Sequence, residues 1–358
     1  MVEVRYINDK DTAFVKTLHS RVDAFFVEEN TDRRGNSKMY RKTIFSLLYF
    51  IGIYFLILFG GIENLIVLAI LWGMMGLGQA FLGMNIMHDK VHGAYSSNFF
   101  VNLLLELPIV AIGVDSFIWS VEHNFYHHNY PNMEGIDQDI HPRFLFRFSS
   151  HQPKKWFHRF QHIYAGFIYS LLIIEWVTLK DFIKIRKYYK EKFVKSKSEL
   201  WFRVISILLK KCIFFTLYFW IPMIVLHQNW HLALLMLSIK VLVSGFVMTV
   251  IFQTAHVVPN CDFIDPKNSA VTDSWHKHQL KTTANFARNN KIVTFLLGGL
   301  NFQIEHHLFP DICHIHYPKL SQIVKKTAEE FKLPYHENGS IWSTIKCHFL
   351  LLKNHGKV

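Results

Sequence analysis

The stretch NLIVLAILWGMMGLGQAFLGMNIMHDKVH, residues 64–92, joins a long uncharged apolar run to a closely spaced pair of histidines. At about 1.5 Å of rise per residue, roughly 20 helical residues cover the ~30 Å hydrocarbon core of a bilayer. Residues 64–87 exceed that length without a single charge. The stretch therefore predicts a helix that crosses a membrane and carries His88 and His92 at its end.

Three further apolar runs have the same character. They cover residues 43–62, 204–226 and 232–255. Short turns separate 43–62 from 64–87 and 204–226 from 232–255, so the four runs predict two helical hairpins. Lys210 and Lys211 lie near the start of the third run and are expected to snorkel toward the headgroups, whereas Lys240 needs a polar partner or a cavity. The expected fold class is an all-α integral membrane protein with four transmembrane helices.

The distribution of basic residues predicts the orientation of these helices. Segments 1–42, 88–203 and 256–358 hold nearly all of the Lys and Arg, and neither hairpin turn has any. The positive-inside rule places these segments in the cytoplasm, where they form a helical cap. Residues 1–42 contain no apolar signal segment. The polar-interrupted stretches 98–114 and 160–178 predict interfacial helices, and 1–358 is expected to form one domain.

The composition excludes several functional classes. Hydrophobic residues make up 51% of the chain and the mean hydropathy is +0.15, which is too apolar for an ordinary soluble domain. The net charge of +12 is expected to face anionic lipid headgroups and not nucleic acid, because the basic residues flank long apolar runs. The four cysteines are widely scattered, which argues against disulfides or a thiolate metal site.

The 22 histidines are the most informative residues, because imidazole is the commonest transition-metal ligand. Three clusters stand next to predicted membrane boundaries. The first is His88 and His92; the second is His123, His127 and His128; the third is His306 and His307. On an α-helix, residues four apart point the same way, and an adjacent residue is turned by about 100°. Each cluster alone also fits a polar helix end, but three on one predicted side favour a metal centre.

The ligand type narrows the choice of metal. Neutral imidazoles without thiolates suit Fe, Zn or Cu, and seven donors exceed the needs of one tetrahedral ion. Two ions are therefore expected. Zinc has no redox chemistry, so two Fe ions with O2 as co-substrate fit this number of histidines better.

The three clusters resemble the histidine boxes of membrane fatty-acid desaturases, in the order His-x3-His, His-x3-His-His and Gln-x2-His-His. The resemblance runs from about residue 40 to 320 and includes the segment from Trp119 to Ile140. Gln303, in place of the first His of the third box, resembles the front-end subgroup of delta-5 and delta-6 type, which inserts a double bond between an existing one and the carboxyl end.

The resemblance implies a set of site residues. The metal ligands would be His88, His92, His123, His127, His128, His256, His306 and His307, with His256 matching a further family ligand at the end of the last span. Asp89 and Gln303 are candidates for orienting these ligands, Asp89 by accepting an imidazole N–H. His276 and His278 are interpreted as loop residues or supports of the ligands. The remaining histidines are expected at the surface or at headgroups, among them His141, His151, His158, His314, His316 and His336.

The resemblance also implies the partners. Many front-end desaturases carry an N-terminal cytochrome b5 domain, but His19 is the only histidine before His88, so a haem held by two histidines cannot form there. Electrons are then expected from a separate donor, either ferredoxin or cytochrome b5 with its reductase. The substrate is expected to be an acyl-lipid or an acyl-CoA.

Two alternatives remain open from the residues. A membrane hydroxylase of the same superfamily would use the same ligands and end in a hydroxyl group. A metal-ion transporter would also be histidine-rich, but it would hold its ligands near the middle of the spans, where this chain has almost no histidine.

Overall fold

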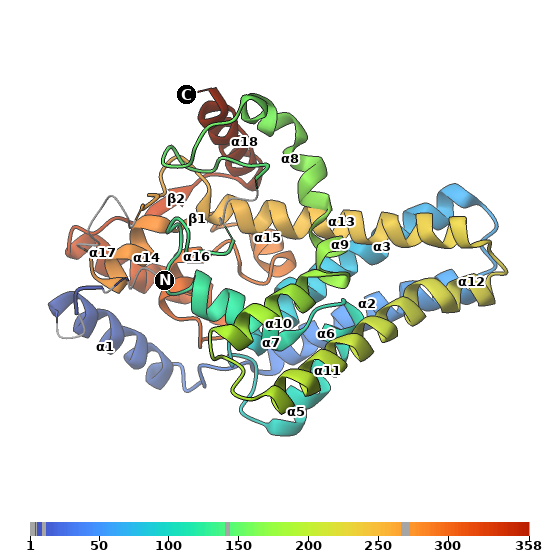
Figure 1. Ribbon diagram of the computed structural model, residues 1–358. Helices are drawn as coiled ribbons and strands as arrows, with labels where there is room; N and C mark the ends of the chain where they lie inside the picture. Colours follow the sequence, from blue (N-terminus) through green and yellow to red (C-terminus); the bar gives the residue numbers. More distant parts are fainter. Residues whose placement is uncertain (1–3, 5, 9–11, 140–143, 266–272, 358) are drawn as a thin grey trace.

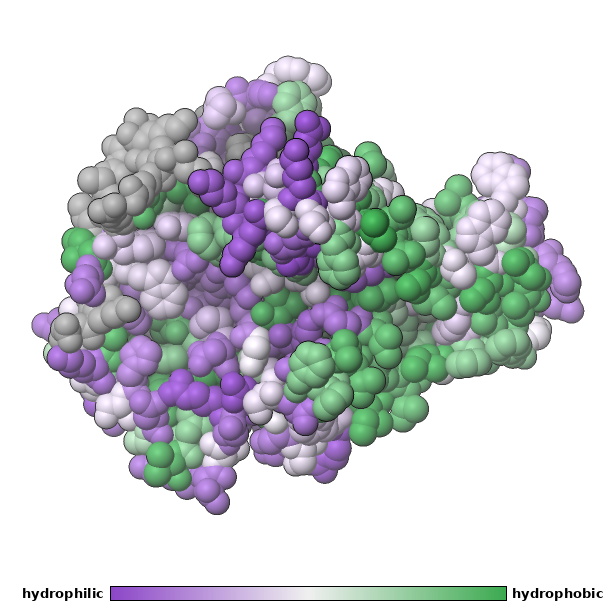
Figure 2. Space-filling model, turned by 60° about the horizontal axis from the view of Figure 1, so that its bottom comes forward, coloured by the Kyte–Doolittle hydropathy of each residue, from purple (hydrophilic) through white to green (hydrophobic). Residues whose placement is uncertain are grey.

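The computed structural model describes residues 4, 6–8, 12–139, 144–265 and 273–357. The chain forms an arm of long helices that projects from a broader body (Figure 1). Apolar residues cover the visible side of the arm, and polar residues are concentrated on the body (Figure 2). The long helices of the arm are α2 (Ser37–Phe59), α3 (Leu65–Leu82), α11 (Lys197–Phe215) and α13 (Trp230–His256).

Four helical segments in the described part of the chain are long and apolar enough to cross a membrane. They are Ser37–Phe59, Leu65–Val91, Lys197–Val225 and Trp230–His256. The second includes the π-helical turn η1 (Gly83–Met87) and α4 (His88–Val91), and the third includes η4 (Thr216–Trp220) and α12 (Ile221–Val225). Each segment overlaps one predicted run, and its ends differ by up to seven residues. The largest differences fall where charged residues extend a helix beyond its apolar run.

Asparagine or serine caps begin all four of these segments. The side chains of Asn36, Asn64, Ser196 and Asn229 accept hydrogen bonds from backbone N–H groups in the first turn. Such a cap satisfies donors that a helix leaves unpaired at its start.

The contact between α3 and α13 explains the buried charge at Lys240. A Cβ on Gly76 would lie 2.5 Å from the carbonyl oxygen of Lys240, so the backbones can approach closely only because this residue is glycine. The Lys240 ammonium group donates to Gln79 and lies 3.8 Å from the centre of the Tyr218 ring. The predicted need for a polar partner is therefore met by an amide oxygen and an aromatic face.

The prediction that Lys211 snorkels toward the headgroups is wrong. Lys211 is buried, forms an ion pair with Asp181, and donates to the carbonyl oxygens of Gly113 at 2.9 Å and Trp176 at 2.6 Å. Its neighbour Lys210 pairs with Asp115 at 2.6 Å. Carboxylates from other segments satisfy both ammonium groups, so neither depends on lipid headgroups.

The two stretches predicted as interfacial helices each form two short helices. Residues 98–114 contain α5 (Phe99–Leu104) and α6 (Glu106–Ala111), and residues 160–178 contain α8 (Gln161–Ser170) and α9 (Leu172–Val177). After α6 the chain bends by 98° into α7 (Ser116–Ser120) and the π-helix η2 (Val121–His127). This bend brings the second histidine cluster back toward the first.

The body consists of the remaining elements and closes over the end of the arm. They are α1 (Ala13–Glu28), η3 (Trp156–Phe160), α10 (Lys180–Lys190), α14 (Trp275–Thr282), β1 (Ala284–Phe286), α15 (Lys291–Leu296), α16 (Gln303–Leu308), η5 (His314–His316), α17 (Tyr317–Glu330), β2 (His336–Asn338) and α18 (Ile341–Lys357). Strands β1 and β2 pair in parallel, which adds a small sheet to the helices that were predicted. A cluster of buried apolar residues that includes Leu18 and Phe302 joins α1 to the segment around α16.

Candidate metal centre

The second histidine cluster lies on a π-helix and not on the α-helix that its spacing predicts. The His128 N–H donates to the His123 carbonyl oxygen at 2.9 Å, a bond between residues five apart. The wider turn brings the Nε2 atoms of His123 and His128 to 3.3 Å. Single π-helical turns are rare and occur often at functional sites. The turn therefore moves His128 onto the same side as His123.

The first group of histidines, named here the His88 group, comprises His88, His92, His123 and His306. One ring nitrogen from each lies within 4.8 Å of those of the others, and the four residues come from three separate segments. The Trp119 ring stacks on His123 with 4.2 Å between centroids, which holds that imidazole in place. Both ring nitrogens of His88 and the Nε2 atoms of His92 and His306 are buried without a hydrogen-bond partner.

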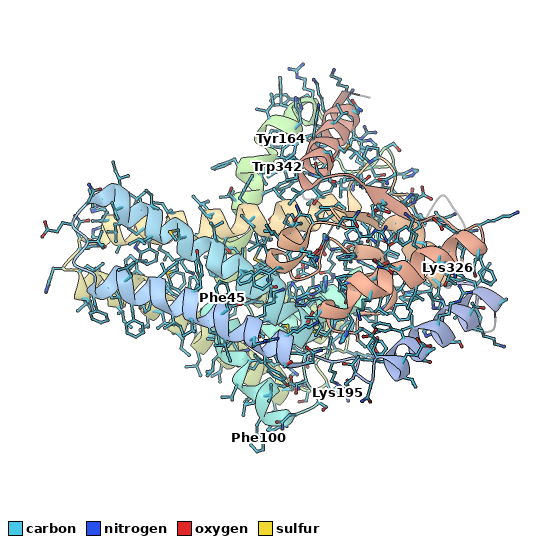
Figure 3. The ribbon with its side chains drawn as sticks, turned by 180° about the vertical axis from the view of Figure 1, so that it is seen from behind. Phe45, Phe100, Tyr164, Lys195, Lys326 and Trp342 are labelled. Atoms are coloured by element: carbon cyan, nitrogen blue, oxygen red, sulfur yellow. The ribbon has the colours of Figure 1, made fainter. Side chains whose placement is uncertain are left out.

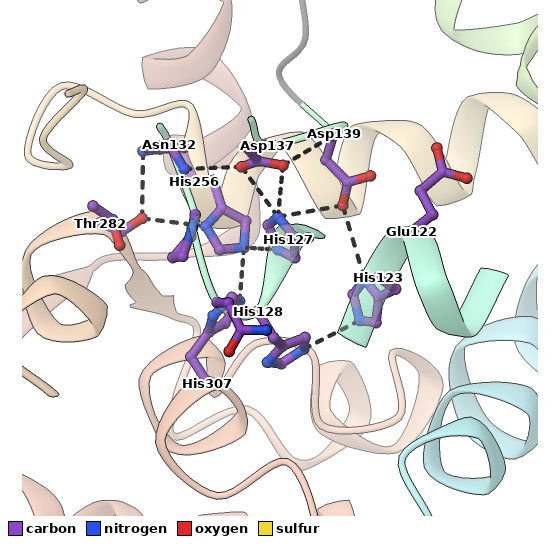
Figure 4. Close-up of polar contacts among 12 residues, drawn as sticks. Glu122, His123, His127, His128, Asn132, Asp137, Asp139, His256, Thr282 and His307 are labelled. Carbon is purple, nitrogen blue, oxygen red and sulfur yellow. Dashed lines mark hydrogen bonds and ion pairs between the residues drawn. The ribbon is translucent and has the colours of Figure 1, made fainter. Parts of the chain in front are cut away.

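The second group, named here the His127 group, comprises His127, His256 and His307. The Nε2 atom of His256 lies 3.2 Å from that of His127 and 3.2 Å from that of His307 (Figure 4). His128 lies between the two groups, and its ring also approaches those of His306 and His307. The structure thus brings together all eight histidines predicted as ligands.

Protein groups hold the opposite ring nitrogen of each member of the His127 group. His127 Nδ1 lies 3.1 Å from Asp137 Oδ1, and His256 Nδ1 lies 3.2 Å from the Thr282 carbonyl oxygen. His307 Nδ1 lies 2.9 Å from Gln279 Oε1. These oxygens can only accept, so each Nδ1 carries the hydrogen and each Nε2 of a neutral ring keeps its lone pair.

The convergence of these lone pairs is the test of whether a metal fits. The Nε2 lone pairs of His256 and His307 face the Nε2 atom of His127, and such an arrangement repels unless a cation lies among the three nitrogens. Burial opposes protonation of His127, but Asp137 and Asp139 raise its pKa to about 9, so a proton on His127 or a metal ion can supply this cation. Burial lowers the pKa of His307, and of His128 and His306, well below the usual value, so these rings are neutral. Neutral buried imidazoles with an orphaned nitrogen suit a transition metal such as iron, zinc or copper. The residues present therefore fit metal binding at both groups.

The third histidine cluster follows directly after a buried glutamate, Glu305, whose carboxyl group is hydrogen-bonded to other segments. Glu305 accepts hydrogen bonds from Asn285 Nδ2 at 2.8 Å and from the Tyr335 hydroxyl at 2.9 Å. Burial raises its pKa to about 7 despite these bonds. Because Glu305 immediately precedes His306, this network fixes the backbone that carries the His306 and His307 rings.

The two residues predicted to orient the ligands lie in different places. Asp89 Oδ1 is 3.9 Å from His88 Nδ1, beyond hydrogen-bonding distance, while Asp89 Oδ2 accepts from His314 Nδ1 at 2.8 Å. Gln303 lines a gap of about 10 Å³ between the two histidine groups, together with His123, His127 and His256. Its amide nitrogen donates to the Leu300 carbonyl oxygen at 2.7 Å.

Several histidines predicted at the surface are buried, and for these the prediction is wrong. His158, His314 and His316 are buried in the body. Each has a backbone or side-chain hydrogen-bond partner there, which offsets the cost of removing its ring from water. His151 is exposed as expected, His336 is half-buried, and His141 lies outside the described residues.

His276 and His278, interpreted as loop or supporting residues, lie on α14. The His278 Nε2 atom is 2.8 Å from the Pro131 carbonyl oxygen, so His278 ties α14 to the segment after the second cluster. Sequence reasoning missed Gln279 and Tyr317, whose hydroxyl lies 3.3 Å from His306 Nδ1. No local sequence pattern identifies Gln279 or Tyr317, because each contacts a histidine more than ten positions away in the chain.

A small cavity adjoins the His88 group. It has a volume of about 50 Å³ and a mixed lining, with aromatic side chains that include Trp119, Phe146, Phe148, Tyr169 and Phe252, and polar or charged side chains that include His123, Glu122, Asp139, Lys180 and Gln253. This volume corresponds to one or two water molecules at ~30 Å³ each. The cavity is thus a narrow space with an aromatic side and a polar side, and it borders a candidate metal ligand.

The fold and the site together define a class, namely a helical membrane protein with a buried histidine cluster that fits metal binding. The family model for fatty acid desaturases matches residues 63–339 of the chain. The chain therefore belongs to the fatty acid desaturase family, which confirms the resemblance that the three histidine clusters indicate.

Curated relatives agree with this family. The chain is 35% identical to the sn-1 linoleoyl-lipid 6-desaturase of Arthrospira platensis over 96% of this chain and 93% of the relative. It is 33% identical to the enzyme of the same name from Synechocystis sp. over 96% of each protein. It is 29% identical to the acyl-lipid (8-3)-desaturase of Physcomitrium patens over 99% of this chain and 74% of the relative.

Proposed function

We propose that the protein is an O2-dependent front-end desaturase that inserts a cis double bond into the acyl chain of a membrane lipid. The observation that carries this proposal is the pair of converging imidazole groups, one of which borders a cavity with many aromatic side chains. Family membership supports desaturation over the hydroxylase and transporter alternatives. The relatives named above are lipid desaturases, which supports an acyl-lipid substrate over acyl-CoA.

The reaction sets the demands on the site. Two adjacent methylene groups each lose one hydrogen atom, and O2 is reduced to two water molecules with two further electrons and two protons from an external donor. Two iron ions, when bound, supply the redox chemistry that O2 needs to attack an unactivated C–H bond.

The ligands proposed for the two ions follow from the two groups. The His88 group would hold one ion and the His127 group the other, with His128 between them. Asp137, Thr282 and Gln279 keep the three rings of the His127 group in the tautomer that presents Nε2. These contacts orient the ligands before a metal arrives.

The aromatic cavity is proposed to position the acyl chain. One methylene pair must be held close to the metal centre, because an offset of about 1 Å is costly for the rate. The cavity borders His123, and its aromatic side offers the apolar surface that an acyl chain requires. Its present volume is too small for a whole chain, so the proposal requires Phe146 and Phe148 to move aside when substrate binds.

The four apolar segments and the family membership make this a membrane protein. We further propose the finer topology, with two transmembrane hairpins, the metal centre in a cytoplasmic cap, and one domain over residues 1–358. The positive-inside distribution of Lys and Arg supports this orientation. A separate donor, ferredoxin or cytochrome b5 with its reductase, would deliver the electrons.

Expression in a host supplied with defined polyunsaturated acids tests the function. Lipid mass spectrometry is expected to reveal a new double bond on the carboxyl side of an existing one. His123→Ala and His307→Ala should each abolish the product and lower the iron content, because each removes a ligand from one group. His151→Ala, at an exposed histidine, is the matched control and should keep both.

Three outcomes would contradict parts of this proposal. Product retained by either ligand variant would refute the ligand assignment. A hydroxylated product would point to the hydroxylase alternative. Tightly bound zinc, with no O2 uptake in the presence of donor and substrate, would refute oxygen chemistry altogether.

A further inference from the structure

A second and larger pocket lies between the beginning of α2 and α15, separate from the aromatic cavity. It has a volume of about 750 Å³. Its polar lining is mostly basic and includes Lys38, Arg41, Lys42, Arg288, Lys291 and His314, beside the neutral Asn289, Thr294 and Gln322. None of the described residues that line this pocket is acidic. We name it the α2–α15 pocket; the proposed reaction makes no use of it.

The basic charge of the pocket is largely uncompensated. Among the described lysines and arginines of the lining, Arg288 is the one with a direct carboxylate partner, Glu337 at 3.0 Å, while His314 contacts the buried Asp89 behind the pocket. Lys38, Arg41 and Lys291 are exposed at the mouth. Several cations gathered around one cavity without carboxylates favour an anionic ligand.

Lys42 lines the inner side of the pocket and is held in place by its contacts. Lys42 is buried, with 7% of its surface exposed, and its Nζ lies 2.9 Å from His314 Nε2. An ammonium group can only donate, so His314 Nε2 accepts and His314 Nδ1 donates to Asp89 Oδ2 at 2.8 Å. Lys42 Nζ also lies 4.8 Å from the centre of the Phe295 ring. These contacts position the cation before any ligand binds.

The surroundings of the pocket indicate that the ligand is amphipathic. The charged first turns of α2 give way to an uncharged run from Thr43 onward, which places the pocket at the boundary of the apolar arm. Phe45 and Phe295 line the pocket and are exposed, and Ile292 and Leu296 of α15 are exposed beside it. Phe45 lies on α2 where the arm meets the body (Figure 3). An anionic head and an apolar tail would each find a matching surface here.

We propose that the α2–α15 pocket binds the phosphate headgroup of an anionic membrane phospholipid, with the acyl chains lying along Phe45 and α15. Phosphate is the anionic group shared by phospholipids, coenzyme A and free phosphate, and the exposed apolar residues favour the phospholipid. Basic pockets beside membrane helices suit such headgroups.

Native mass spectrometry of the full-length protein tests this site. Phosphatidylglycerol is expected to bind more tightly than phosphatidylcholine, and the double variant Arg41→Gln/Lys291→Gln should weaken phosphatidylglycerol binding roughly tenfold to thirtyfold. Asn289→Asp, which adds a negative charge to the lining, should weaken it in the same direction. Lys353→Gln, at an exposed lysine on α18, which contributes no residue to the lining, is the matched control and should bind like the parent.

Each competing result has a defined meaning. Equal binding of the two lipids, or equal binding by the double variant and Lys353→Gln, would overturn the proposed site. Displacement of phosphatidylglycerol by coenzyme A or inorganic phosphate at equal concentration would show that the phosphate group bound in the pocket does not belong to a phospholipid. The readout is lipid binding and not turnover, so a failure of the proposed desaturation would leave this result intact, and the reverse also holds. Unchanged iron content in the variants would exclude misfolding.

Discussion

The two histidine groups differ in how the protein holds them. In the His127 group, every Nδ1 atom has an oxygen partner between 2.9 and 3.2 Å away. In the His88 group, His88 has no hydrogen-bond partner on either ring nitrogen, and His306 has only the Tyr317 hydroxyl at 3.3 Å. Hydrogen bonds to the protein therefore orient every ring of the His127 group, whereas in the His88 group the proposed metal ion would complete the contacts of His88 and His306.

Removal of a ligand from the oriented group should have the largest effect. His256→Ala leaves two of the three converging Nε2 donors, so we expect loss of one iron per chain and of all detectable desaturation. Metal analysis of the purified variant, together with lipid mass spectrometry, measures both. Full iron content in this variant would show that His256 is not a ligand.

Loss of an orienting carboxylate should have a smaller but clear effect. Asp137→Asn removes the negative charge beside His127 Nδ1, and loss of such a partner typically weakens metal binding about 10- to 100-fold. Competition with a chelator of known affinity gives the value. Asp311→Asn, an exposed acid, serves as control. An effect no larger than that of the control would remove the proposed difference between the groups.

The order of metal release should distinguish the groups further. A chelator is expected to remove iron in two phases, with the ion of the His88 group leaving first at a rate about tenfold higher, since preorganised ligands hold an ion longer. Stopped-flow absorbance follows both phases. In Asp137→Asn the two release rates should become more similar. A single phase in the parent protein would contradict the proposed difference between the two histidine groups.

The smallest effect is expected at the hydroxyl beside His306. Tyr317→Phe removes one contact of 3.3 Å at the edge of the hydrogen-bond range, so iron affinity should change less than about threefold. The same chelator competition measures it. A change as large as that in Asp137→Asn would mean that the His88 group is also oriented by the protein.

Much of the architecture was predictable because its signals are local. Four long apolar runs can be read directly from the sequence, with Lys210, Lys211 and Lys240 as their only charges, and the described residues contain four long apolar helices at these places. The eight candidate ligands were also found from short clusters and one family match, and they lie together. Spacing predicted an α-helix for His123 to His128, however, and the chain forms a π-helix there.

The sequence by itself determined the membrane helices, the family and the ligand candidates, because apolar length and histidine spacing are properties of neighbouring residues. Only the tertiary structure decided which histidines share a group, that Gln279 orients His307, and that Lys211 and His314 are buried. The same holds for the α2–α15 pocket, which joins Lys42 to residues about 250 positions away. Such contacts depend on how distant segments pack, and the balance between burying a charge and pairing it is settled only when both partners are in place.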